Sequence, residues 1–257
     1  MEISAEFMRR LAQVAAAETL PRFRNQGTVS NKLSAGFDPV TEADREAESA
    51  IRSVIGAEFP DHGILGEEHG NHNISSRHVW VIDPIDGTRA FISGIPVWGT
   101  LVGLTEDGEA VAGMMSQPFT GELFYANGSG SHYEGPSGSR RLAVRQTTRV
   151  EDATLFTTTP ALFTGEMRGR YDRFEKQVQL VRYGTDCYAF AMLAAGHVDI
   201  VVEPGLKPYD IVALIPIIEK AGGVITTFEG GPAEAGGDVI AAATPELHAA
   251  AMAALRG

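Results

Sequence analysis

The sequence predicts an α/β protein in two parts, an α+β part over residues 1–143 and an α/β part over residues 144–257. Three patterns support this prediction: two amphipathic segments open the chain, several strand-like segments follow them, and the second half alternates strand with helix. The chain of 257 residues is 44% hydrophobic and 21% charged. It therefore has the composition of a globular protein and enough length to bury a sizeable core.

Two helices are expected at the start of the chain. Apolar side chains recur at near-helical spacing over residues 3–23 and again from Thr41 to Phe59, while residues 25–39 have loop composition. Thr41 suits the N-cap position of the second helix. Asp44 follows three residues later and can complete a capping box, which is one interpretation of this acid.

An antiparallel meander is expected next, because the apolar period changes to two. Hairpin turns are predicted at residues 106–109, which read Glu-Asp-Gly-Glu, and at Asn127-Gly128. The Gly/Ser/Pro-rich residues 135–139 are expected to end the meander, and residues 140–146 to cross into the second part. The expected strands cover residues 96–104, 110–117, 122–125 and 130–134.

Strands and helices are expected to alternate in the second part. Gly196 lies where a helix C-terminus commonly has glycine. The expected strands cover residues 153–158, 178–182, 197–202, 224–228 and 239–243. The expected helices cover residues 164–176, 186–195 and 211–221, with a last one from Pro245.

Residues 78–91 contain the candidate chemistry. An apolar strand is expected to stop at Asp83, where Pro84 disfavours a helical conformation. A second carboxylate follows at Asp86, before Gly87-Thr88, a turn that can leave backbone N–H groups pointing outward. Two carboxylates this close repel each other unless a cation lies between them, and all-oxygen ligands suit Mg²⁺. The N–H groups favour phosphate; the alternative is an ordinary surface turn.

Composition narrows the classes of partner. The net charge of −12 and the isoelectric point near 5.0 argue against binding of nucleic acid. The single cysteine, Cys187, excludes an intrachain disulfide and is expected to be a small buried residue. No apolar signal core and no run of transmembrane length is present, so no membrane partner is expected and a cytoplasmic location is predicted.

Further acids lie outside this stretch. Glu67-Glu68 ends the short apolar segment 63–66, and exposed loop carboxylates are the usual explanation for such a doublet. Asp210 directly precedes the apolar segment 211–221, where an N-cap role is the simplest interpretation.

The motif Asp83-Pro84-Ile85-Asp86-Gly87-Thr88 resembles the metal-binding signature of the inositol monophosphatase superfamily, Mg²⁺-dependent and Li⁺-sensitive phosphatases of sugar and polyol phosphates. The continuation over residues 89–94, and then Pro96-Val97-Trp98-Gly99-Thr100-Leu101, is most similar to its histidinol-phosphate phosphatase branch. The resemblance covers nearly the whole chain. It implies a layered αβαβα sandwich of the sugar-phosphatase type and a homodimer.

The resemblance also implies the metal ligands, for two or three Mg²⁺ ions. Glu67, Asp83 and the Ile85 carbonyl would hold the first ion. Asp83, Asp86 and Asp210 would hold the second, with Asp83 bridging the two. Glu68 would reach a weaker third ion.

The same resemblance assigns the catalytic groups. Asp44 and the Thr88 hydroxyl would orient and deprotonate a water molecule on the metal that Glu67 holds. The Gly87 and Thr88 amides would neutralise phosphate charge during transfer. Direct attack by water is expected, without a phosphoenzyme.

The organic half of the substrate is expected to meet acidic residues. Glu203 lies seven residues before Asp210, where the family contacts the alcohol, and Asp210 is also counted among the substrate-binding groups. Asp186 departs from the pattern of enzymes acting on inositol, and carboxylates suit the ammonium and imidazole of histidinol. The alternative for Asp186 is an N-cap of the following helix. Arg182 could contact phosphate or pair with these acids.

The function predicted from these residues is Mg²⁺-dependent hydrolysis of the small phosphomonoester L-histidinol phosphate, a step of histidine biosynthesis. A broad inositol-1-phosphate phosphatase is the main alternative. A nucleotide 3′-phosphatase of the same superfamily ranks lower, as does a metal-binding regulatory protein without turnover.

Overall fold

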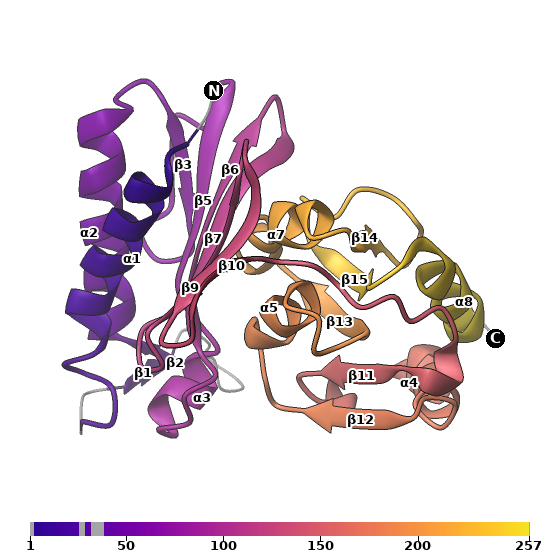
Figure 1. Cartoon of the computed structure of the whole chain (residues 1–257). Helices are drawn as coiled ribbons and strands as arrows, with labels where there is room; N and C mark the ends of the chain where they lie inside the picture. Colours follow the sequence, from indigo (N-terminus) through magenta and orange to yellow (C-terminus); the bar gives the residue numbers. More distant parts are fainter. Residues whose placement is uncertain (1–2, 26–28, 32–38, 257) are drawn as a thin grey trace.

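The fold has five layers, which alternate helices and sheets (Figure 1). The computed structural model describes residues 3–25, 29–31 and 39–256. Two helices cover one face of an eight-stranded sheet, a middle layer of helices separates that sheet from a five-stranded one, and further helices cover the outer face. The predicted αβαβα architecture is therefore confirmed.

The first helix layer consists of α1 (Ala5–Thr19) and α2 (Glu42–Glu58). The rings of Phe7 on α1 and Trp80 in the sheet lie 5.5 Å apart between centroids, which places this layer directly on the sheet. The predicted capping box at Thr41 and Asp44 is present. The expected loop before it was wrong in part, because β1 (Val29–Asn31) pairs antiparallel with β2 (Pro39–Thr41); residues 26–28 and 32–38 of that loop lie outside the described residues.

The eight-stranded sheet has the order β10-β9-β8-β7-β6-β5-β3-β4 and is antiparallel except between β3 and β5. The predicted hairpin turns at residues 106–109 and 127–128 are confirmed. The segment expected to leave the sheet instead returns along its edge as β10, because residues 138–141 pair with β9. The strands are β3 (Gly63–Gly66), β4 (Asn71–His72), β5 (His78–Asp86), β6 (Gly99–Glu106), β7 (Glu109–Gln117), β8 (Glu122–Asn127), β9 (Gly130–Gly135) and β10 (Gly138–Arg141).

Strand β5 continues past the residue where it was expected to stop. Asp83 faces Leu101 of β6 and Asp86 faces Gly99, so the register shifts between the two pairs. An irregularity of this kind accommodates Pro84, which has no N–H for the ladder. Both carboxylates therefore lie on a distorted strand end, immediately before the short helix α3 (Thr88–Ile92).

The five-stranded sheet has the order β12-β11-β13-β15-β14. The expected helix 211–221 is broken in two, and its first part begins earlier, at Pro208. The strands are β11 (Thr154–Thr157), β12 (Leu180–Tyr183), β13 (Ile200–Leu206), β14 (Val224–Thr227) and β15 (Gly237–Ala242). The helices are η1 (Val150–Asp152), η2 (Pro160–Leu162), α4 (Gly165–Phe174), α5 (Tyr188–Ala194), α6 (Pro208–Ile211), α7 (Leu214–Lys220) and α8 (Pro245–Arg256).

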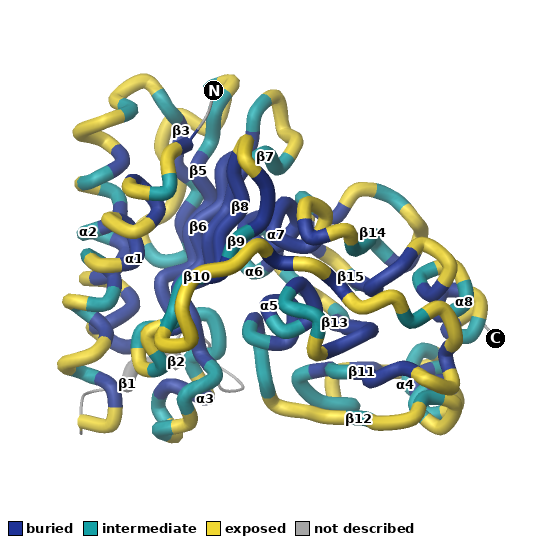
Figure 2. Tube along the Cα trace, in the orientation of Figure 1, coloured by how far each residue is buried: buried dark blue, intermediate teal, exposed yellow. Residues whose placement is uncertain are grey.

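The two parts share one hydrophobic core at the middle layer. The strands of the first sheet that border this layer, among them β6 and β8, are the large dark blue area of Figure 2. Leu101 and Met115 of the first sheet belong to the same buried cluster as Leu214 and Ile218 of α7. A side chain at Gly113 would overlap the carbonyl of Ala213, so this glycine permits the close approach. The division at residues 143/144 stays a prediction.

Cys187 is buried, as expected. Within the described ranges, no helix combines the length and the apolar character needed to cross a membrane.

Candidate active site

Three carboxylates meet where α6 packs against β5. Oxygen atoms of Asp83, Asp86 and Asp210 all lie within 4.8 Å of one another, and we call these three residues the acidic cluster. Asp83 is buried and the other two are partly exposed. The fold therefore brings together three of the predicted metal ligands from distant parts of the chain.

Backbone N–H groups orient the two acids of β5. The amide of Ile85 donates to Asp83 Oδ1 at 3.0 Å, and the amide of Cys187 donates to Asp86 Oδ2 at 2.7 Å. The Thr100 hydroxyl donates to the Pro84 carbonyl at 2.8 Å and fixes the irregular strand end from β6. Each carboxylate therefore has a defined direction before any ligand binds.

Asp210 is held within its own helix. It is the third residue of α6, whose N-cap is Lys207, and the Lys207 amide donates to Asp210 Oδ2 at 2.7 Å. The interpretation of Asp210 as an N-cap was wrong, because α6 begins two residues before it. Its side chain instead reaches back to the cap.

The electrostatics of the acidic cluster favour a cation. Burial raises the pKa of Asp83 well above its ordinary value, and the nearby charges of Glu67, Asp86 and Asp210 raise it further. Burial, followed by the charge of Asp186, likewise raises the pKa of Asp86. Burial raises the pKa of Asp210 to about 6. Carboxylates that raise each other's pKa in this way become ionised together when a divalent cation neutralises them.

Glu67 and Glu68 follow β3, and Glu67 lies beside the acidic cluster. The Glu67 amide donates to the Ile82 carbonyl at 3.2 Å, which attaches this segment to β5. The charge of Glu67 raises the pKa values of Asp83, Asp210 and Asp44. Glu67 is thus close to all three of these acids. It is not a member of the acidic cluster, which among the described residues consists of Asp83, Asp86 and Asp210.

The side chains of Asp44 and Thr88 form hydrogen bonds with residues three positions away in the sequence. The Thr41 amide and hydroxyl donate to Asp44 Oδ2 at 2.8 and 2.5 Å, and burial raises the pKa of Asp44. The Thr88 hydroxyl donates to the Ile85 carbonyl at 3.1 Å. Their joint action on a water molecule stays a prediction.

Gly87 is the left-handed N-cap of α3, with a φ of 81°. A Cβ at this position would lie 2.9 Å from Asp186 Oδ2, so only glycine fits without a shift. The contact also places Asp186 directly beside the predicted phosphate-binding turn.

Asp186 and Glu203, which we call the carboxylate pair, are joined through Thr158. The Thr158 amide donates to Glu203 Oε1 at 2.5 Å, and its hydroxyl donates to Asp186 Oδ1 at 3.4 Å. Burial raises the pKa of Glu203 to about 8. The interpretation of Asp186 as an N-cap was wrong, because Cys187 is the N-cap of α5. Sequence reasoning missed Thr158, which nothing distinguishes from other threonines at a strand end.

Arg182 lies exposed on the edge strand β12. Among the residues that the structure describes, no hydrogen bond or ion pair joins it to the acidic cluster or to the carboxylate pair. Its predicted contact with phosphate or with these acids stays a prediction.

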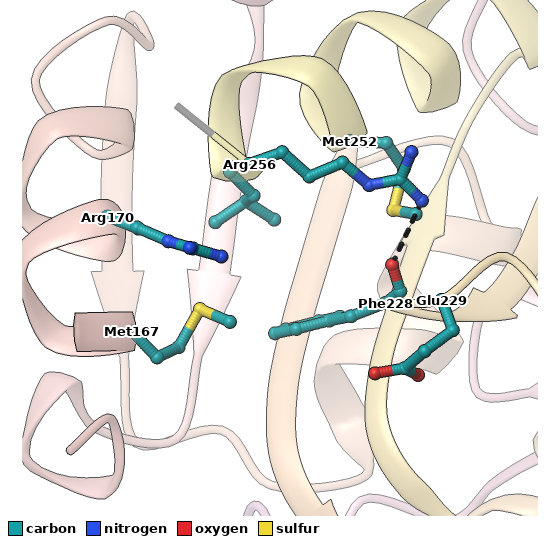
Figure 3. Close-up of a pocket in the computed structure, with 7 residues that line it drawn as sticks. Met167, Arg170, Phe228, Glu229, Met252 and Arg256 are labelled. Carbon is teal, nitrogen blue, oxygen red and sulfur yellow. Dashed lines mark hydrogen bonds between the residues drawn. The ribbon is translucent and has the colours of Figure 1, made fainter. Parts of the chain in front are cut away.

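A cavity of about 380 Å³ lies at the outer face of the second part, away from these acids (Figure 3). It contains none of the predicted site residues. Its lining residues come from α4, from the end of β14 and from α8: Met167, Arg170, Phe228, Glu229, Met252, Leu255 and Arg256.

Comparison with known proteins identifies the family. The model of the inositol monophosphatase family matches residues 2–257. The chain is 44% identical over 197 residues to a chloroplastic bifunctional phosphatase of Arabidopsis thaliana, covering 76% of the chain and 56% of that protein. It is 38% identical over 194 residues to a histidinol-phosphatase of Chlorobaculum parvum, covering 75% of the chain and 73% of that protein.

Solved structures agree with this result. An inositol monophosphatase from Zymomonas mobilis superposes with a TM-score of 0.87 at 38% sequence identity, covering 99% of this chain and 100% of that one. The relatives therefore include phosphatases named for histidinol phosphate and for inositol phosphate.

Proposed function

The chain belongs to the inositol monophosphatase family and is a phosphomonoester hydrolase, and we propose that its main substrate is L-histidinol phosphate. The products would be L-histidinol and phosphate, in histidine biosynthesis. The observation that supports this substrate most directly is the carboxylate pair, because Asp186 lies against Gly87 and shares Thr158 with Glu203. If the phosphate group is bound at Gly87, the cationic alcohol that leaves from it would lie within reach of both carboxylates.

We propose that the site holds two or three Mg²⁺ ions. The donor set fits a hard divalent cation, since it consists of carboxylate oxygens within 4.8 Å of one another and contains no sulfur or imidazole ligand. Glu67, Asp83 and the Ile85 carbonyl would hold one ion, Asp83, Asp86 and Asp210 a second, and Glu68 a third. Bound Mg²⁺ would activate the attacking water and stabilise the departing alkoxide.

The protein's own groups would complete the reaction. Asp44, together with the Thr88 hydroxyl, would orient the water and accept its proton. The Gly87 and Thr88 amides would donate to the phosphate oxygens as negative charge develops on them. Water would attack phosphorus directly, the phosphorus–oxygen bond to histidinol would break, and the departing oxygen would take a proton from a solvent water molecule.

The carboxylate pair would bind the organic half. Asp186 is held by the Thr158 hydroxyl and Glu203 by the Thr158 amide, so both acids are oriented without a substrate. The ammonium and imidazole groups of histidinol offer N–H donors to carboxylate oxygens. Inositol offers only neutral hydroxyls, which would not compensate the burial of these acids as well.

Inositol 1-phosphate is the second candidate substrate. The similarity to the Zymomonas mobilis inositol monophosphatase, at 38% identity over almost the whole chain, favours it. The two candidates share the same metal chemistry and differ in what the carboxylate pair must bind. From the sequence and the family resemblance we also propose a homodimer that works in the cytoplasm.

Phosphate release from L-histidinol phosphate and from D,L-inositol 1-phosphate, each with Mg²⁺ and with EDTA, tests the proposal. A large kcat/KM preference for histidinol phosphate that EDTA abolishes is the expected result, and Asp186→Asn should reduce that preference. Comparable or better turnover of inositol 1-phosphate would be compatible with the metal mechanism but would contradict the proposal that histidinol phosphate is the main substrate.

A further inference from the structure

Glu48 is a fully buried carboxylate on α2, and its exposed fraction is 0%. It faces the segment of residues 66–70, which contains the two acids after β3. We propose that Glu48 is a positioning residue, which fixes the backbone of Glu67 and Glu68 so that these two acids can bind a divalent cation.

Both oxygens of Glu48 accept backbone N–H groups from that segment. Oε2 accepts from the Glu68 amide at 2.7 Å, and Oε1 accepts from the His69 amide at 3.1 Å. Consecutive amides thus converge on one carboxylate that lies 20 residues earlier in the chain. Hydrogen bonds from a charged acceptor are stronger than neutral ones, so the segment has one preferred backbone conformation.

Gly66 makes this approach possible. A Cβ at Gly66 would overlap the Glu48 carboxylate and the Arg52 guanidinium. The last residue of β3 therefore has to be glycine for the Glu48 side chain to reach the amides beyond it.

Arg52 completes the same arrangement one helical turn later. Its Nε donates to Glu48 Oε1 at 2.7 Å, and its guanidinium also donates to the Gly70 carbonyl. The charge of the buried carboxylate is thereby compensated, which a carboxylate with no access to water requires. The segment is bound at its amides by Glu48 and at its last carbonyl by Arg52.

These contacts determine where Glu67 lies. Its own amide is bonded to the Ile82 carbonyl of β5, and the next amide along the chain is bonded to Glu48. Glu67 is therefore fixed between the sheet and α2, close to Asp83 and Asp44. Because Asp44 lies one turn before Glu48 on α2, one helix sets the position of the proposed base relative to the proposed ligand.

The inference rests on the Mg²⁺ dependence in the proposed function. The variant is Glu48→Gln, and the matched control is Glu46→Gln, an exposed acid of the same helix. Mg²⁺ binding to the folded proteins is measured by titration calorimetry, and the KM for L-histidinol phosphate is measured at saturating Mg²⁺. We expect Glu48→Gln to weaken Mg²⁺ binding by about tenfold or more, with little change in KM, and the control to match the wild type.

The measured Mg²⁺ affinities test the positioning role of Glu48 separately from the proposed function. A folded Glu48→Gln protein that binds Mg²⁺ as tightly as the wild type would overturn the positioning role. If Glu48→Gln does not fold, Glu48→Asp takes its place, because it keeps the negative charge on a shorter side chain that cannot reach both amides; unchanged Mg²⁺ binding there would overturn the role equally. A wild type that binds no Mg²⁺ would instead contradict the proposed function.

Discussion

The acidic cluster and the carboxylate pair are built in different ways, although they lie side by side. Two members of the acidic cluster, Asp83 and Asp86, come from one strand end; the Ile85 amide, two residues away, orients Asp83, and the Cys187 amide, 101 residues away, orients Asp86. The carboxylate pair is assembled by Thr158, which lies 28 residues from Asp186 and 45 from Glu203 in the sequence. We infer that one strand end places two of the three acids proposed to bind metal, whereas the carboxylate pair depends entirely on how distant segments pack.

The strongest test of this comparison removes a charge from the acidic cluster. Asp86→Asn keeps an oxygen that can accept the Cys187 amide, so the fold should survive. Loss of a metal ligand removes several kcal/mol of transition-state stabilisation, so kcat should fall by about a thousandfold or more, for either substrate. Phosphate release with Mg²⁺ and circular dichroism measure the two effects, with the exposed Asp61→Asn as control. Full activity in Asp86→Asn would refute the metal mechanism.

Asp44→Asn tests whether Asp44, which lies near the acidic cluster, acts in catalysis and not in metal binding. The Thr41 amide can still donate to the amide oxygen of the new side chain, so the start of α2 should remain capped. Removing a general base costs about 10² to 10⁴ in rate, and we expect kcat to fall in this range while Mg²⁺ affinity changes little. Titration calorimetry and steady-state kinetics give both quantities. Weakened Mg²⁺ binding at near-normal kcat would make Asp44 a metal ligand instead.

Local patterns were enough to predict the acids of β5 and the capping box of α2. Asp83 and Thr41 each have a main partner within three residues, so spacing alone indicated their surroundings. Asp86 follows in the same turn, but its amide partner is Cys187, 101 residues away, which spacing could not indicate. The β10 edge strand and the break between α6 and α7 were not predicted, because they depend on which surfaces are available for pairing and packing. Thr158 and Glu48 were missed for the same reason, since their partners lie far away in the sequence.

The pH dependence of stability tests the environment of the carboxylate pair. Burial raises the pKa of Glu203 to about 8, from an ordinary value of 4.5. A carboxyl whose pKa is higher in the folded state stabilises the fold fully below the unfolded pKa, and this contribution is lost as the pH rises through the folded pKa. The metal-free wild type should therefore lose stability as the pH is raised from about 5 to about 9.

Glu203→Gln removes this titration and should reduce that loss by an amount on the order of 1 to 3 kcal/mol. The free energy of unfolding in urea at both pH values measures it, and the difference between variant and wild type cancels the contribution of the other acids. Parallel profiles for the two proteins would show that Glu203 is ionised in the folded protein throughout this range.

The smallest expected effect concerns Thr158, which joins the two acids. Thr158→Val keeps the amide that donates to Glu203 and removes only the hydroxyl that donates to Asp186. One hydrogen bond of this kind contributes about 1 kcal/mol, so kcat/KM for L-histidinol phosphate should fall by roughly fivefold. Mg²⁺ affinity should not change, because the hydroxyl contacts neither member of the acidic cluster on β5. Thr226→Val, in β14, is the matched control. A loss of Mg²⁺ affinity in Thr158→Val would show that the two halves of the site are coupled, and that substrate choice cannot be altered without disturbing the metal chemistry.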